Sequence, residues 1–199
     1  MGMTLREFIN AYNRLTSHGW LTLDEALLLA AMAEETNGPM LEIGCYQGRS
    51  SMLLAQLREQ VPVLCYGGQT WENRQRQLYC IDPWDDSFSD LPGSEVYERF
   101  CANIASIGAI VSVERCRAED LHLRPWWSAF RTEFAYLDGD HTYAGTRTQI
   151  SRALECFPRV ICIHDVNDSG DGAEIKRAAI EMLGPWTARV GRLAAWRIR

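Results

Sequence analysis

The sequence lacks the cysteine patterns that mark zinc sites or disulfide frameworks. It has seven cysteines, at positions 45, 65, 80, 101, 116, 156 and 162, but no C-x-x-C pair and no histidine at zinc-ligand spacing. An odd number of scattered cysteines is typical of reduced thiols that act as small buried hydrophobic residues in an intracellular protein. We therefore expect free, buried thiols and a cytoplasmic location.

Long apolar runs and clustered positive charge are also absent. No segment approaches the roughly 20 apolar residues that cross a bilayer, and residues 1–22 have no apolar centre of the kind found in a signal peptide. The chain carries 20 Lys and Arg against 26 Asp and Glu, a net charge of -6, and its basic residues are scattered. This composition argues against a membrane or a nucleic acid as partner.

What the sequence does contain is an alternation of strand-like and helical periodicity. Strands are expected at residues 40–43, 78–81, 110–114, 134–137 and 160–163, with a terminal hairpin at residues 187–198. Helices are expected near residues 50–60, 94–107, 143–156 and 173–183, with a short helix at 125–130 and two helices before residue 38. This order predicts an α/β fold: a Rossmann-like, doubly wound, mainly parallel seven-stranded sheet with a terminal antiparallel hairpin.

The length of the chain suits one hydrophobic core. With 199 residues, 47% of them hydrophobic, we expect a single domain over residues 1–199. Residues 1–38 would form N-terminal helices and residues 39–199 a cofactor-binding core. Residues 61–77, which carry no readable motif, are interpreted as an insertion. The oligomeric state is left open, a homo-oligomer included.

Polar residues follow four of the expected strands. Gly44, Asp82 and Asp138 each come directly after a strand, and His164 with Asp165 follows another. In doubly wound sheets, ligands bind at the carboxyl ends of the strands. The sequence therefore predicts a binding site at this edge of the sheet.

The loop after the first strand reads L-E-I-G-C-Y-Q-G-R-S over residues 41–50. It is not the G-x-G-x-x-G dinucleotide fingerprint, because a tyrosine stands where the second glycine would be. It resembles the E-x-G-x-x-x-G loop of class I S-adenosylmethionine-dependent methyltransferases. That resemblance implies cofactor contacts, around its methionine part, from Glu42, Gly44, Tyr46, Gly48 and Ser50. The alternative is an ordinary strand-to-helix turn.

The next strand end supplies an acid. Asp82 is placed to accept the hydroxyl protons of a ribose, as acids do at this point of nucleotide-binding α/β proteins; alternatively it starts a turn before Pro83. Trp84 would stack on the adenine or pack in the core. The same fold places residues around the adenine near Ala118 and Glu119, which otherwise form an exposed acidic turn.

The motif D-G-D-H-x-Y-x-G at residues 138–145, with H-D at 164–165, is the most specific signal. It resembles the small-molecule O-methyltransferases of the macrocin, cephalosporin and catechol types. The resemblance implies that Asp138, which also borders the cofactor, holds Mg²⁺ or Mn²⁺ together with His164 and Asp165. It also implies that His141 is a general base, with Asp138 and His141 as the catalytic pair.

This chemistry suits methyl transfer to an alcohol. A divalent cation lowers the pKa of the hydroxyl that it binds, and a nearby imidazole accepts the proton. The expected acceptor is a small hydroxylated metabolite, a sugar or a polyketide type. Three structural alternatives stand beside this interpretation: Asp140 caps the helix that follows, His141 is an exposed loop residue, and His164 is held by internal hydrogen bonds.

Two other functions remain open at this point. The K-P-G-G turn that relatives carry before the H-D strand is replaced here by F-P-R-V at residues 157–160. A non-catalytic S-adenosylmethionine-binding regulatory module is therefore one alternative. A nicotinamide-dependent oxidoreductase is the other, and the absence of a G-x-G pair argues against it.

Overall fold

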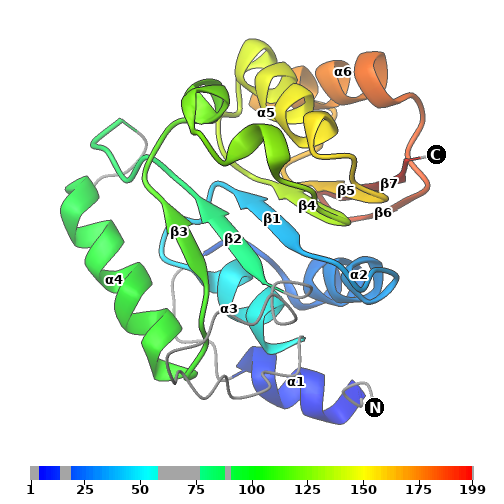
Figure 1. Cartoon of the computed structure of the whole chain (residues 1–199). Coiled ribbons are helices and arrows are strands. Elements are labelled where there is room, and N and C mark those ends of the chain that lie inside the picture. Colours follow the sequence, from blue (N-terminus) through cyan, green and yellow to red (C-terminus); the bar gives the residue numbers. More distant parts are fainter. Residues whose placement is uncertain (1–4, 14–18, 58–76, 88–90, 199) are drawn as a thin grey trace.

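The computed structural model describes residues 5–13, 19–57, 77–87 and 91–198. Within them, seven strands form one sheet in the order β3-β2-β1-β4-β5-β7-β6 (Figure 1). Strands β1 to β5 run parallel, and β7 pairs antiparallel with both β5 and β6. Their bounds are β1 Met40–Ile43, β2 Leu78–Ile81, β3 Ser112–Glu114, β4 Phe134–Leu137, β5 Val160–Ile163, β6 Ala188–Val190 and β7 Leu193–Arg197. The predicted fold class is confirmed.

Helices cover both faces of the sheet (Figure 1). One face packs against α1 Leu5–Asn13, α2 Leu23–Glu34, α3 Arg49–Gln56 and α4 Gly93–Ser106. The other packs against α5 Tyr143–Glu155 and α6 Asp171–Leu183, with the 3-10 helices η2 Ala118–Leu123 and η3 Trp127–Ala129. Side chains alternate along each strand, so that Met40 enters the first core and Leu41 the second. Both faces are therefore buried, as a parallel sheet requires.

Element boundaries differ from expectation where local chemistry decides them. The helix expected at residues 50–60 ends at Gln56 in the described structure, and the strand expected from residue 110 begins at Ser112. Helix η2 was not expected, because six residues with i, i+3 hydrogen bonds leave little periodicity to detect. Of the expected insertion at residues 61–77, only residue 77 lies within the described residues.

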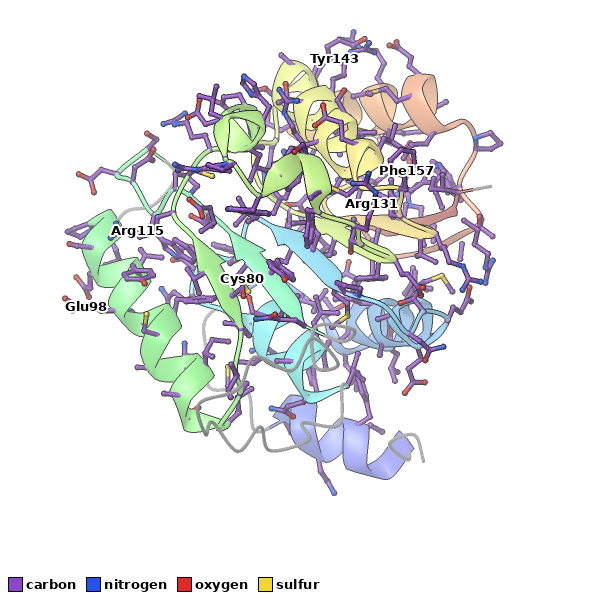
Figure 2. The ribbon with its side chains drawn as sticks, viewed as in Figure 1. Cys80, Glu98, Arg115, Arg131, Tyr143 and Phe157 are labelled. Atoms are coloured by element: carbon purple, nitrogen blue, oxygen red, sulfur yellow. The ribbon has the colours of Figure 1, made fainter. Side chains whose placement is uncertain are left out.

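The expectation that all cysteines are buried is wrong for Cys101, which is exposed on α4. Five others are free and buried, at positions 45, 80, 116, 156 and 162, and position 65 lies outside the described residues. Figure 2 shows Cys80 on β2 in the interior, with Glu98 and Arg115 at the periphery. In the described part of the chain, no helix has the length and apolar character needed to cross a bilayer.

Candidate active site

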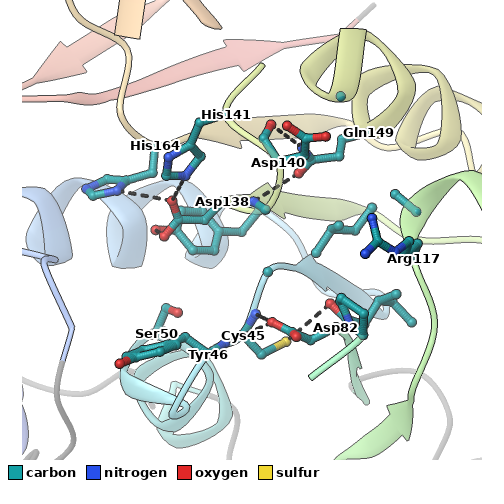
Figure 3. Close-up of a pocket in the computed structure, with 18 of the residues that line it drawn as sticks. Cys45, Tyr46, Ser50, Asp82, Arg117, Asp138, Asp140, His141, Gln149 and His164 are labelled. Atoms are coloured by element: carbon teal, nitrogen blue, oxygen red, sulfur yellow. Dashed lines mark hydrogen bonds and ion pairs between the residues drawn. The ribbon is translucent and has the colours of Figure 1, made fainter. Parts of the chain in front are cut away.

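A cavity of about 460 Å³ opens where β1, β2, β4 and β5 end (Figure 3). Its wall is formed by the segment before α2, by the loops after β1 and β2, and by the residues after β4 and β5. Eleven of the sequence-predicted site residues line it: Gly44, Tyr46, Ser50, Asp82, Trp84, Ala118, Glu119, Asp138, His141, His164 and Asp165. The fold thus brings together residues that follow all five parallel strands, at the edge where the sequence placed a site.

Asp82 holds the glycine loop in place. Its Oδ2 accepts the backbone N–H groups of Cys45 at 2.8 Å and Tyr46 at 3.0 Å, and its Oδ1 accepts that of Trp84 at 2.8 Å. Burial raises the pKa of Asp82, although the three backbone donors oppose that shift. A carboxylate has about four acceptor positions, so one remains for a ligand hydroxyl. Asp82 therefore has a structural role beside the ribose contact that the sequence predicted.

Glu42 and Gly48 lie behind the wall rather than on it. The side chain of Glu42 is fully buried and accepts the Ser50 hydroxyl. Burial raises the pKa of Glu42 to about 7. Gly48 begins α3 at a φ of +88°, and a Cβ there would lie 3.0 Å from the Phe100 ring. The sequence predicted that both residues contact the cofactor. In the structure neither lines the cavity, and both support the loop from its inner side.

The ring of Trp84 belongs to the core as much as to the cavity. It is only 3% exposed and packs against Tyr97 and Phe100, with ring centroids 5.0 and 4.8 Å away. Its indole N–H donates to the carbonyl of Tyr46 at 2.8 Å. This position favours the core alternative over adenine stacking, because the side chain is almost wholly buried and packs on two rings of α4.

The far end of the cavity carries an ion pair that the sequence did not indicate. Ala118 and Glu119 open η2 and line the wall as predicted. Beside them Arg117 donates to Asp85 at 2.7 Å, and both residues also line the cavity (Figure 3 labels Arg117). No motif connects Arg117 with Asp85, because their contact depends on the packing of two separate loops.

Asp138 directly follows β4 and lies at the centre of a cluster of polar side chains (Figure 3). Its Oδ2 accepts the Tyr136 hydroxyl at 3.0 Å. Its Oδ1 lies 3.2 Å from Nδ1 of His164 and 3.7 Å from Nε2 of His141. Burial alone would raise the pKa of Asp138, but the two imidazoles lower it to about 2. Asp138 is therefore ionised at neutral pH.

Asp165 is held in a conformation that few residues adopt. Its φ of +56° lies in the left-handed region, which costs a non-glycine residue of the order of 1 kcal/mol. Its Oδ2 lies 3.5 Å from Nε2 of His141. Its buried Oδ1 lies 2.9 Å from Nη1 of Arg192, but no well-directed hydrogen bond reaches it in the described part of the chain. The turn directs the carboxylate toward the cavity instead of continuing β5.

His164 lies beneath these acids, with its side chain 2% exposed. Its Nδ1 faces Asp138 and is 3.6 Å from Oδ1 of Asp165, while its Nε2 is 3.5 Å from Oε2 of Glu25. Burial would lower the pKa of the imidazole, but the surrounding carboxylates raise it to about 9. Both ring nitrogens of His164 are therefore directed at acidic groups.

The loop after β4 is held in place by hydrogen bonds to Gln149. Gln149 accepts the N–H of Gly139 at 3.0 Å and donates to the carbonyl of Asp140 at 2.8 Å. The structural alternative in which Asp140 caps the next helix does not hold: Thr142 is the N-cap, and the Asp140 carboxylate accepts the N–H of Thr142 at 2.8 Å. The loop leaves the side chain of His141 42% exposed at the cavity.

The cluster fits a divalent cation. Ligand atoms of Asp138, His141 and Asp165 all lie within 4.8 Å of one another, and Nδ1 of His164 is close to both acids. Two carboxylates with an imidazole suit Mg²⁺ or Mn²⁺, and the imidazole favours Mn²⁺.

A second group with metal-ligating side chains, Glu42 with Cys45 and Cys80, is wholly buried. Burial raises the pKa of both thiols and disfavours the thiolate that a metal needs. This group is therefore less suited to a cation than the cluster around Asp138.

Sequence reasoning missed several residues that contact the cluster or line the cavity. Glu25 was visible only as the partner of Thr22 at the start of a helix, and Arg192 only as part of a terminal hairpin. Trp20 and Arg49 line the cavity without belonging to a motif. Their roles depend on tertiary packing, so the sequence carried no signal for them.

The chain was compared with protein families, with curated sequences and with solved structures. A family model described as a methyltransferase domain matches residues 41–166. No curated protein sequence matches the chain significantly.

Three solved structures illustrate the likeness in fold. CalS11, a TDP-rhamnose 3'-O-methyltransferase of calicheamicin biosynthesis, is 16% identical with a TM-score of 0.59, covering 99% of this chain and 96% of its own. TomG of Streptomyces achromogenes, an O-methyltransferase solved with S-adenosylmethionine, is 18% identical with a TM-score of 0.58, covering 99% and 92%. A Bacillus cereus O-methyltransferase solved with S-adenosylhomocysteine is 16% identical with a TM-score of 0.58, covering 98% and 90%. At identities this low, the structural likeness shows a shared fold and nothing further.

Proposed function

Because the chain belongs to the methyltransferase domain family, we propose that it transfers a methyl group from S-adenosylmethionine to a hydroxyl of a small metabolite. The observation that carries the proposal is the position of Asp138. Its backbone lies against Gly44 of the glycine loop, where a Cβ would come within 2.3 Å of the Asp138 carbonyl oxygen. Its carboxylate belongs to the acid and imidazole cluster. One residue therefore joins the cofactor half and the acceptor half of the cavity.

The cofactor half is built from the loops after β1 and β2. S-adenosylmethionine, when bound, supplies a methyl group on a sulfonium. Gly44, Tyr46 and Ser50 would surround its methionine part, and Asp82 would accept a ribose hydroxyl. Ala118 and Glu119 would lie beside the adenine. TomG and the Bacillus cereus enzyme were solved with this cofactor or its demethylated product, which supports the assignment.

The acceptor half is built from the ends of β4 and β5. Asp138, Asp165 and His164 would hold Mg²⁺ or Mn²⁺, which when bound lowers the pKa of a hydroxyl and orients it. We assign the third ligand to His164 rather than to His141. The His164 imidazole is buried and its orientation is fixed from both sides, whereas His141 lies in a loop with 42% of its side chain exposed.

His141 is assigned the role of general base. It lines the cavity, and its Nε2 is 3.5 Å from Asp165 and 3.7 Å from Asp138. The Asp138 contact raises the pKa of His141, which makes the imidazole a stronger proton acceptor. The side chain can thus take the hydroxyl proton without leaving the acidic cluster.

The rim of the cavity supports an acceptor with a flat apolar face. Trp20 is 70% exposed there, and its ring centroid lies 5.6 Å from that of Tyr46. Aromatic faces pack well against sugar rings and planar polyketides, which are the acceptor types that we propose. Arg49 on the same wall adds a positive charge at this rim.

The test combines binding with turnover. Calorimetry should detect S-adenosylhomocysteine but not NAD, and a panel of sugars and polyketides should reveal methylation that EDTA abolishes and Mn²⁺ restores. Asp138→Asn should lose this metal-dependent turnover. His141→Ala should retain Mn²⁺ affinity but lose about 10²-fold or more in rate.

Other outcomes would select the alternatives. Binding of NAD in place of S-adenosylhomocysteine would point to an oxidoreductase. Cofactor binding without turnover on any acceptor would favour a regulatory module. Turnover that resists EDTA would leave His141 as base without a metal, and loss of Mn²⁺ affinity in His141→Ala would make that residue a ligand.

A further inference from the structure

Glu25, in the first turn of α2, is a buried carboxylate that serves three separate parts of the chain. Its Oε2 accepts the N–H and the hydroxyl of Thr22 at 2.9 and 2.8 Å, which closes a capping box. Its Oε1 accepts the N–H of Arg192, in the hairpin turn, at 2.8 Å. Its Oε2 also lies 3.5 Å from Nε2 of His164. The last two contacts go beyond what a helix cap requires.

The surroundings of Glu25 are built for close approach. The residue is only 2% exposed, and a buried carboxylate is costly unless each oxygen has a donor. Gly191, at a φ of +55°, lies so near that a Cβ there would meet Oε1 of Glu25 at 2.5 Å. The hairpin turn therefore closes directly onto the carboxylate.

Each carboxylate oxygen of Glu25 contacts a residue that in turn contacts one of the two acids, Asp138 or Asp165. Through Oε2, Glu25 contacts His164, whose Nδ1 lies 3.2 Å from Asp138. Through Oε1 it holds the backbone of Arg192, whose Nη1 lies 2.9 Å from Asp165. The Glu25 carboxylate thus supports His164, which contacts Asp138, and Arg192, which contacts Asp165.

We propose that Glu25 is a positioning residue for the metal centre, and this inference rests on the proposed function. A histidine that binds a metal commonly donates its second N–H to a carboxylate, which fixes its tautomer and its ring. Glu25 stands in that place for His164, with Nδ1 directed at the acids. Through the backbone of Arg192, whose Nη1 lies 2.9 Å from Oδ1 of Asp165, Glu25 also supports the orientation of that carboxylate.

The experiment measures Mn²⁺ binding by electron paramagnetic resonance on the full chain, without cofactor or acceptor. Glu25→Gln keeps the size of the side chain but turns an amide N–H toward one of the donors. Glu25→Asp keeps the charge but shortens the reach by one methylene. Both should bind Mn²⁺ 10- to 100-fold more weakly than wild type, the usual loss when such a partner is changed. If Glu25→Gln does not fold, Glu25→Asp carries the test.

A matched control separates positioning from stability. Leu29→Val removes a core methylene from the same helix, where Leu29 is fully buried, without touching the cluster. It should lower Tm and leave Mn²⁺ affinity unchanged. Histidine nitrogen-15 NMR of the Mg²⁺-loaded protein gives a second measurement: His164 should be a single Nε2-protonated tautomer in wild type and a mixture in the Glu25 variants.

Two results would overturn the inference in distinguishable ways. Unchanged Mn²⁺ affinity in both Glu25 variants, with Tm lowered as in Leu29→Val, would reduce Glu25 to a helix cap while leaving the proposed function intact. A wild-type protein that binds no Mn²⁺ would remove the metal from the proposed function and the role of Glu25 with it.

Discussion

At the residue scale, Asp82 combines two roles that a substitution should remove together. Asp82→Ala removes the acceptor of three backbone N–H groups and, in the function that we propose, the acceptor of a ribose hydroxyl. We expect S-adenosylhomocysteine affinity to fall by about 1.5 to 3 kcal/mol, the range for a hydrogen bond to a charged group, and Tm to fall as well. Calorimetry and thermal unfolding measure the two effects. Asp85→Ala, which removes the partly exposed pair with Arg117 and the exposed acceptor of the Ser87 N–H, is the control and should lower Tm far less.

Burial of Glu42 should make the stability of the fold depend on pH. Its pKa is raised to about 7 in the fold, chiefly by burial, with the charges of Asp138 and Asp82 adding to the shift. The folded state therefore holds the proton more tightly than the unfolded chain, where the pKa is near 4.5. The stability that Glu42 contributes is complete below pH 4.5 and is lost as pH rises through 7.

Glu42→Gln cannot ionise, so this loss should disappear. The free energy of unfolding of the variant relative to wild type should increase by up to about 3 kcal/mol between pH 4.5 and pH 8. Urea unfolding at several pH values measures the difference. A difference that does not change with pH would show that Glu42 is ionised in the folded protein across this range.

Single residues were predictable where a strand end exposed them. Asp138, His164 and Asp165 follow apolar strands, and parallel topology brings such ends to one edge. Glu25 was not predictable as part of the site, since its capping-box pattern already accounted for it. When a residue already fits a local motif such as a helix cap, a single sequence carries no further sign of its contacts with distant residues.

At the scale of elements, Gly44 determines how closely β1 and β4 approach where they end. Gly44→Ala would place a Cβ 2.3 Å from the Asp138 carbonyl oxygen, and its φ of +88° disfavours any side chain. We expect a loss of about 3 kcal/mol or more in unfolding free energy, from strain and overpacking together, and loss of cofactor binding. Gly108→Ala is the matched control, because Gly108 also has a positive φ, +65°, but a Cβ there would meet no described heavy atom within 4 Å. Equal losses in the two variants would contradict this account.

The elements themselves were largely predictable, and their ends were not. Apolar periodicity located the five parallel strands and the hairpin, because buried strands must be continuously apolar. The sequence did not decide the cap of α5, because Asp140 and Thr142 are both good cap residues, and only the loop geometry set by Gln149 selects between them. Helix η2 was not predicted, because its six residues are too few to show a helical periodicity of apolar side chains.

At the scale of the whole molecule, ligands of the cavity should stabilise the fold. A ligand that binds only the folded state adds about 2.7 kcal/mol at a hundredfold excess over its Kd. S-adenosylhomocysteine at that excess should raise Tm by roughly 5 to 10 °C for a domain of this size. Scanning calorimetry with and without ligand measures the shift, and NAD serves as the negative control. No shift at saturating S-adenosylhomocysteine would argue against the cofactor assignment.

The contact of Glu25 with Arg192 spans 167 positions of the sequence, and this has a consequence for biosynthesis. A ribosome makes the chain from its N-terminus, so Glu25 emerges long before the hairpin that supplies its Oε1 donor. The glycine loop and the first strands are synthesised early, whereas the support of Asp165 by Arg192 cannot form until residue 192 has been added. A nascent or prematurely terminated chain would therefore lack an ordered acidic cluster. The half of the cavity that we propose for the acceptor can therefore be completed only after the hairpin has been synthesised.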